Sequence, residues 1–261
     1  MGHEQVLYKH RQAEGGGIIM AKTNKKSLSI GVLLAASFFG VLLLIFSPVF
    51  GDGRNGLTYA DDMFNKLSKG SSYFIPDLRK DSEKFNGQAL SVKISAAKPD
   101  DKPGDTEKRI ADISKVLTAA GAKIEVSGTD LKIDGDLGAI LSSALQDSDA
   151  MYKNQGDAIR ARYSSDDEKK MFRQWYNAFT AIDKNLKKEG KVEQAKIISD
   201  VTKKAVETAY NYYTVEAVKV KDKAVLMTAL LVFYVIYTMW WGFAIYYIFD
   251  GVGLSMSKAK H

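Results

Sequence analysis

Two long apolar runs constrain this chain more than any other feature. Residues 28–46 and residues 224–249 contain no charged side chain, and 177 residues rich in polar side chains separate them. A helix needs about twenty apolar residues to cross about 30 Å of hydrocarbon. Both runs therefore predict transmembrane helices, and the residues between them predict a water-soluble domain.

Basic residues beside the two runs predict an orientation. Lys22, Lys25 and Lys26 precede the first run, and Lys258 and Lys260 follow the second. Cytoplasmic flanks of transmembrane helices carry an excess of Lys and Arg. We therefore expect both termini in the cytoplasm and an extracytoplasmic central domain, in the cytoplasmic (inner) membrane of a bacterium.

The first nineteen residues are predicted to be a non-native or disordered extension. Residues 14–17 would be encoded by a purine-rich stretch shortly before the codon of Met20, as in a mistranslated bacterial ribosome-binding site. We expect the true start at Met20, and the alternative is a start at Met1 with a disordered tail. A secretory signal peptide is the alternative for the first run. The run exceeds the usual 7 to 15 apolar residues of a signal peptide and no A-x-A-like site follows, which favours an uncleaved anchor.

The predicted organisation has eight parts. These are the extension 1–19, a basic flank 20–27, a first transmembrane helix 28–50, a connecting segment with a short helix 51–85, a small α+β unit 86–135, a helical bundle 136–223, a second transmembrane helix 224–249 and a cytoplasmic tail 250–261.

The second run carries aromatic side chains near its middle, where apolar aliphatic residues are usual. Antiparallel counting places Ser37 at the depth of Tyr237, and the small residue Gly40 would allow close approach of a bulky helix. One hypothesis is a hairpin in which Tyr237 bonds to Ser37. The other is an aromatic face for a partner subunit or, less favoured, a quinone. The candidate intramembrane interface comprises Ser37, Gly40, Tyr234, Tyr237, Trp240 and Trp241.

The central domain is predicted to be mainly α with a small α+β unit. Residues 86–135 read as strand, helix, strand, strand, because short alternating runs flank one amphipathic segment. Helical periodicity then continues from 137 to about 162, and Ser165 to Glu168 predicts a capping box for the next helix. No Gly or Pro interrupts residues 191–241, which predicts one continuous helix of about 90 Å from 191 to 249 that includes the second span.

Composition excludes several kinds of chemistry. The chain has no Cys, which rules out disulfides, thiolate metal sites and iron–sulfur clusters, and its three histidines are His3, His10 and His261. No set of acid, base and nucleophile can be assembled, so we expect no enzyme, no catalytic residues, no cofactor and no metal. Residues 51–223 contain 30 Lys and Arg against 28 Asp and Glu, which predicts no nucleic-acid partner.

These features favour an accessory or scaffold subunit of a membrane assembly, for example a respiratory one, whose domain binds another protein. The alternatives are an extracytoplasmic ligand sensor that passes its signal to a partner, and a structural protein that self-associates in the lipid bilayer. Only twelve residues follow residue 249, which argues against a sensor with its own output domain. No particular partner or small-molecule ligand is predicted.

Overall fold

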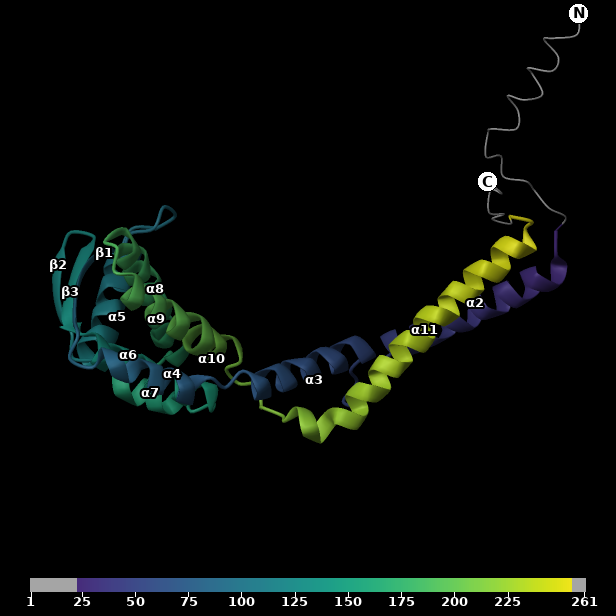
Figure 1. Cartoon of the computed structure of the whole chain (residues 1–261), viewed down its shortest axis with the longest axis horizontal. Helices are drawn as coiled ribbons and strands as arrows, with labels where there is room; N and C mark the ends of the chain where they lie inside the picture. The colour runs from purple at the N-terminus through teal and green to yellow at the C-terminus, as the bar shows by residue number, and fades with distance from the viewer. Residues whose placement is uncertain (1–22, 255–261) are drawn as a thin grey trace, which may run out of the picture. The chain divides into compact units, whose positions relative to one another are not determined.

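The structure is a computed structural model that describes residues 23–254 (Figure 1). It divides into two compact units, one reaching to Asp62 and resuming at Lys221, the other Met63–Val220. The described residues are mostly helical with one small antiparallel sheet, which confirms the mainly α fold class with a small α+β element. The expectations for residues 1–22 and 255–261, including the start at Met20 and the roles of Lys258 and Lys260, lie outside the described residues.

The first unit is built on two helices that lie side by side, α2 (Lys25–Phe46) and α11 (Ala224–Gly251) (Figure 1). At 1.5 Å per residue they measure about 33 and about 42 Å, so both are long and apolar enough to span a membrane. The side chain of Asn24 caps the start of α2 by accepting from the Ser27 amide. The helix ends at Phe46, just before Ser47 and Pro48, because a residue that precedes proline disfavours helical geometry.

The second unit contains the sheet and most of the remaining helices. The strands are β1 (Ala89–Ser95), β2 (Lys123–Ser127) and β3 (Asp130–Asp136), paired antiparallel in the order β1-β3-β2, with α5 (Asp105–Ala119) between β1 and β2 in the chain. This confirms the predicted strand, helix, strand, strand order. Side chains alternate along β1, so that Leu90, Val92 and Ile94 are buried and their neighbours are exposed.

The other described elements are helical. They are α3 (Gly56–Ser71), α4 (Ile75–Ser82), η1 (Glu83–Phe85), α6 (Leu137–Tyr152), α7 (Gly156–Tyr163), α8 (Glu168–Lys188), α9 (Val192–Val201), the π-helical turn η2 (Thr202–Val206), α10 (Glu207–Asn211) and η3 (Val220–Lys223). Phe172, Trp175 and Phe179 of α8 are fully buried, as their heptad spacing predicts. A single hydrophobic cluster joins the sheet to α4, η1 and the helices from α5 to α10, so residues 86–135 and the helices after them share one core.

A buried carboxylate ties three helices of this core together. Asp147 of α6 accepts hydrogen bonds from Arg162 at 2.5 Å, from the Trp175 indole at 2.7 Å and from the Tyr163 hydroxyl. Burial, reinforced by this carboxylate, raises the pKa of Tyr163 far above its usual value. Asp147 is therefore a structural acid, because its oxygens are used by partners within the fold.

The prediction of one continuous helix from residue 191 to 249 is wrong. The helical segment ends at Asn211, and residues 212–219 are not helical. Lys69 lies 3.1 Å from the Tyr212 carbonyl oxygen and 2.5 Å from that of Val215. Asn154 accepts from the Thr214 amide at 2.9 Å. Side chains distant in sequence thus take the groups that would continue the helix, a break that no Gly or Pro marks.

Two further helix boundaries differ from prediction. The helix expected from 137 to about 162 is divided into α6 and α7, with Asn154 at a φ of +60° between them. The cap of α8 is Asp167, which accepts from the Lys170 amide at 2.8 Å, so Ser165 to Glu168 is not a capping box. Glu168 is the first residue of α8 and uses its carboxylate elsewhere.

The Glu168 carboxylate joins α7, α8 and the end of the domain. It accepts hydrogen bonds from Arg160 at 2.6 Å and from the Tyr213 hydroxyl at 2.8 Å. Hydrogen bonds from its own backbone amide, from Tyr213 and from Arg160 lower its pKa from 4.5 to about 2. The charged form is therefore favoured by folding.

Lys69→Met is expected to lower the free energy of unfolding by about 3 kcal/mol, because it leaves two carbonyl oxygens and Asn154 without their buried donor. Urea unfolding of the full chain in detergent, followed by circular dichroism, measures the change. The matched variant Lys80→Met, at an exposed position, should stay within about 0.5 kcal/mol of the parent. Equal losses in the two variants would contradict a structural role for the Lys69 ammonium.

Glu168→Gln is expected to remove part of the acid sensitivity of the fold. Because folding lowers the pKa of Glu168, its contribution is present above about pH 4.5 and is lost as the pH falls toward about 2. The unfolding midpoint measured between pH 2 and pH 6 should therefore fall less steeply in the variant. Parallel profiles for variant and parent would rule out this carboxylate as a source of the pH dependence.

Candidate functional site

Aromatic side chains of α11 pack against α2. The Trp240 indole donates to the Leu34 carbonyl at 3.1 Å, and the Tyr237 hydroxyl donates to the Phe38 carbonyl at 3.0 Å. The Tyr237 ring stacks on Phe38 with centroids 4.1 Å apart. The hydrogen bond between Tyr237 and Ser37 is not formed. Ser37 donates to the Leu34 carbonyl at 2.9 Å instead, as helical serines commonly do.

The other predicted interface residues divide between the two sides of the pair. Trp241 lies against α2, with its ring 4.7 Å from that of Phe38. Gly40 faces open space, so it does not serve as the point of close approach. Tyr234 is 67% exposed. The structure therefore brings Tyr237, Trp240 and Trp241 to the helix pair and leaves Gly40 and Tyr234 outside it.

The close approach occurs at two glycines that the sequence analysis did not select. A Cβ at Gly31 would lie 2.6 Å from the Ile248 backbone nitrogen, and one at Gly251 would lie 2.5 Å from the Leu28 Cα. At the same end, the Asn24 amide donates to the Gly251 carbonyl at 3.0 Å. Pairing small residues near the ends of the two runs, rather than near their middles, would have pointed to this contact.

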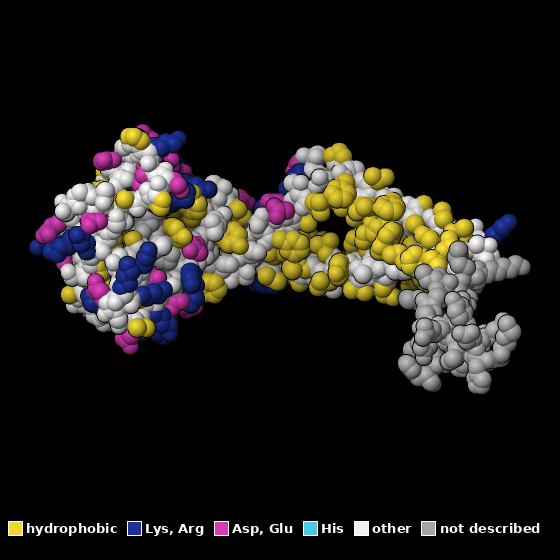
Figure 2. Space-filling model, turned by 90° about the horizontal axis from the view of Figure 1, so that it is seen from above, with side chains coloured by type: hydrophobic (Ala, Val, Ile, Leu, Met, Phe, Trp, Pro, Cys, Tyr) yellow, Lys and Arg dark blue, Asp and Glu magenta, His cyan; other side chains and the backbone are white. Residues whose placement is uncertain are grey.

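Figure 2 shows apolar side chains gathered over α2 and α11, in contrast to the mixed charges over the second unit. The most exposed of them on the helix pair include Leu33, Leu43, Leu231 and Tyr234. Exposed apolar surface on this scale marks contact with lipid or with another protein. The outer surface of the pair is thus the first candidate site.

Gly31→Ala is expected to weaken the pairing of α2 and α11 by about 1–3 kcal/mol, because its methyl group would overlap the backbone of Ile248 and must force the helices apart. The matched variant Gly40→Ala meets no atom within 4 Å and should leave the pairing unchanged. Unfolding titrations in mixed detergent and dodecyl sulfate measure both. Equal behaviour of the two alanine variants would contradict the contact at Gly31.

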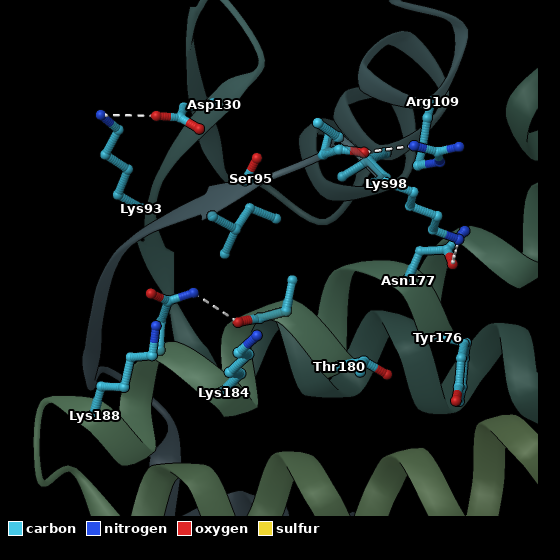
Figure 3. A pocket seen from close by; sticks show the side chains of 16 residues that line it. Lys93, Ser95, Lys98, Arg109, Asp130, Tyr176, Asn177, Thr180, Lys184 and Lys188 are labelled. Carbon is cyan, nitrogen blue, oxygen red and sulfur yellow. Dashed lines mark hydrogen bonds and ion pairs between the residues drawn. The ribbon is translucent and has the colours of Figure 1, made fainter. Parts of the chain in front are cut away.

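The second unit contains a groove between β1 and α8, a cavity of about 770 Å³ (Figure 3). One wall is the chain from Lys93 to Lys98, at the end of β1 and just beyond it. The other is the face of α8 that carries Tyr176, Thr180, Lys184 and Lys188 at helical spacing. The groove is therefore framed by a strand edge and a helix of one rigid core.

An ion pair fixes the loop at one end of this groove. Arg109 donates to both carboxylate oxygens of Asp101, at 2.7 and 2.5 Å, and to the Ala96 carbonyl at 2.5 Å. Thr106 adds a hydrogen bond to Asp101 at 2.7 Å. The Arg109 guanidinium and these hydrogen bonds hold the pKa of Asp101 well below its usual value. The charge of Arg109 is thus already matched within the fold.

The remaining cations of the groove are less engaged. The Lys93 ammonium pairs with the Asp130 carboxylate at 3.0 Å, and the Lys98 ammonium donates to the side-chain amide oxygen of Asn177 at 3.4 Å. Burial, together with nearby arginines, lowers the pKa of Lys98, which reflects a positive local field. Among the described residues, Lys184 and Lys188 have no anionic partner. The groove therefore offers positive charge to a ligand.

From the sequence alone, these lysines counted only toward the nearly even charge balance of residues 51–223. Lys184 and Lys188 are four residues apart on a helix whose other face is core, so their common direction was readable from the sequence. What the sequence did not show is that β1 lies beside them. In residues 23–254, no group of three or more His, Cys, Asp or Glu side chains is placed to hold a metal ion.

Comparison of the chain with protein-family models, with curated proteins and with solved structures gives no match. The outer surface of the helix pair and the groove are therefore interpreted from their own geometry and chemistry.

Asp101→Asn is expected to loosen the loop from residue 96 to 104, because a neutral amide loses the ionic hydrogen bonds from Arg109. Amide hydrogen exchange in this loop should accelerate while exchange in α8 stays unchanged. The matched variant Asp100→Asn, next to it in the same loop, should leave exchange as in the parent. Unchanged exchange in Asp101→Asn would remove the ion pair as the anchor of the loop.

Proposed function

We propose that this chain is a non-catalytic accessory or scaffold subunit of a membrane assembly. In this proposal α2 and α11 cross a bacterial cytoplasmic membrane as a hairpin, both termini are cytoplasmic, and the domain between them binds an extracytoplasmic protein. The apolar outer surface of the helix pair and the lysines at the start of α2, Lys25 and Lys26, support this placement.

The observation that carries the proposal is the hydroxyl of Tyr234. Tyr234 lies about 5 Å from the midpoint of α11 along the helix axis, and it is 67% exposed. Among the described residues its hydroxyl has no hydrogen-bond partner, whereas Tyr237 and Trp240 have theirs on α2. An unsatisfied hydroxyl in hydrocarbon is costly. A neighbouring transmembrane helix with an acceptor removes that cost, which favours a partner subunit over lipid at this face.

The domain supports a binding role more than a catalytic one. Its most strongly shifted acids, Asp101 and Glu168, are each held by an arginine and a hydroxyl of the same fold. Carboxylates used in this way stabilise the structure rather than react with a substrate. The groove beside β1 is open and lined by lysines, which suits recognition of another molecule.

The test is photocrosslinking from the membrane face, with benzoylphenylalanine in place of Tyr234 and, as control, in place of Phe38, which packs inside the pair. The proposal expects Tyr234 to capture one or a few other membrane proteins in intact cells, identified by mass spectrometry after purification in mild detergent. The Phe38 position should crosslink within the chain. Crosslinks from Tyr234 to lipid alone, with a monodisperse lone protein, would overturn the proposal, and crosslinks to a second copy would replace it with self-association.

A further inference from the structure

We propose that the groove between β1 and α8 binds an extended acidic segment of a partner protein, which adds to β1 as a fourth strand of the sheet. This inference rests on the proposed function, because it names how the domain would hold its partner. Three features of the described residues carry it. They are a strand edge without a neighbouring strand, two lysines of α8 without an anionic partner, and a match between the spacing of these lysines and the two-residue repeat of a strand.

The first feature is the edge of β1. The order β1-β3-β2 leaves one side of β1 without a strand. Leu137 donates to the Gln88 carbonyl and Ala96 donates to the Thr129 carbonyl, which fixes the alternation of the ladder between them. Every second residue of β1 therefore bonds to β3, and the backbone groups of Lys93 and Ser95 point to the open side. Lys93 and Ser95 also line the groove.

The position of Lys191 agrees with that alternation. Its ammonium lies 3.5 Å from the Ser91 carbonyl oxygen, so the Ser91 backbone also points away from β3. Proteins usually protect a strand edge with lysines that point across it. Here Lys191 covers only the Ser91 end, and Lys93 is held by Asp130 of β3, its neighbour in the sheet. The edge from Lys93 to Ser95 remains available for pairing.

The second feature is the charge beside this edge. Lys184 and Lys188 project from α8 toward the groove and have no anionic partner among the described residues (Figure 3). Lys98 at the far end shares the positive field. An added strand with acidic side chains would supply the missing negative charge, and it would also satisfy the backbone groups of β1.

The third feature is a match of spacings. Lys184 and Lys188 are separated by four helical residues, a rise of about 6 Å. Side chains on one face of a strand recur every two residues, at about 6.7 Å. A strand that runs along β1 with acidic residues at alternate positions would therefore place one carboxylate near each lysine. Thr180 and Tyr176 continue the row at the same interval and offer hydroxyl groups beyond the two lysines.

The chemistry of the groove favours a polypeptide over a small polyanion. Small phosphorylated ligands are usually held by converging donors, above all by arginine forks. Within residues 23–254, Arg109 is the only arginine that lines the groove, and Asp101 already occupies its fork. The other cations are single ammonium groups spread along the groove, which suits a ligand with spaced charges.

The probe is a fluorescein-labelled hexapeptide of alternating Glu and Val, titrated with the full chain in detergent micelles and read by fluorescence anisotropy. We expect saturable binding that weakens with added salt. The double variant Lys184→Glu with Lys188→Glu should weaken binding by about tenfold or more, because attraction becomes repulsion at two positions. The matched double variant Lys80→Glu with Lys196→Glu, at exposed positions outside the groove, should bind as the parent does.

Two further probes separate strand addition from simple charge attraction, and they leave the protein unaltered. A peptide of the same sequence with N-methyl groups on alternate amides keeps its charge but loses one hydrogen-bonding edge. Two isomers are compared, one methylated on the amides that would pair with β1 and one methylated on the amides that point away from it. We expect only the first to bind about tenfold more weakly than the parent peptide. Tripolyphosphate is the small-anion probe, and we expect it to compete poorly.

Several outcomes would overturn this inference. They are no binding of the Glu–Val peptide, equal binding of both N-methyl isomers and the parent peptide, tight binding of tripolyphosphate, or equal effects of the two double variants. None of these results bears on the crosslinks from Tyr234, which test membership of an assembly through the membrane face. A failed groove with a captured membrane partner would therefore leave the proposed function in place.

Discussion

A single buried ammonium group determines where the domain ends. Lys69 is only 2% exposed and no carboxylate of the described part of the chain neutralises it, so its burial is costly. Three oxygen acceptors from α6–α7 and from the end of α10 compensate, and the ring of Tyr152 lies beneath the cation at 5.0 Å. Burial lowers the pKa of Lys69, as expected for a cation without an acidic partner. The same contacts that satisfy this charge consume the carbonyls that would otherwise continue α10.

The helix pair follows the packing rules that hold inside membranes. Without water to drive apolar surfaces together, helices associate through small residues and shared hydrogen bonds. Gly31 and Gly251 supply the close contact, and Tyr237 and Trp240 donate to carbonyl oxygens of α2. Tyr234 is an exception, because its hydroxyl has no hydrogen-bond partner among the described residues. A polar group without a hydrogen-bond partner in its own fold is where a contact with another molecule is most expected.

Local patterns were enough to predict the elements, and contacts distant in sequence account for most of the differences. Alternation in β1 indicated both the strand and its buried face, and the spacing of three and four residues between Phe172, Trp175 and Phe179 matches the face of α8 that packs on the same core. The helix break at residues 212–219 depends on Lys69 and Asn154, whose approach no local pattern shows. The Tyr237 hydroxyl was predicted to form a hydrogen bond with Ser37 of the first span. It donates to the backbone carbonyl of Phe38 instead, and the Ser37 hydroxyl donates to the Leu34 carbonyl of its own helix.

The groove illustrates a different reason for incomplete prediction. Lys184 and Lys188 are visible in the sequence, as is the strand 89–95, but their meeting depends on the order of the strands. Had β1 been the central strand, its open edge would not exist and the same lysines would be plain surface charge. Strand order is set by packing of the whole sheet on α5 and α8, so it is the least local property of this fold.

The non-helical segment from residue 212 to 219 also limits how the chain can transmit force. A continuous helix acts as a stiff shaft, so that twisting or pushing one end moves the other. Here residues 212–219 are not helical, and Lys69 and Asn154 hold backbone groups of Tyr212, Thr214 and Val215 instead. No continuous helix therefore runs from α10 into α11, and a rotation of one about its axis is not passed directly to the other.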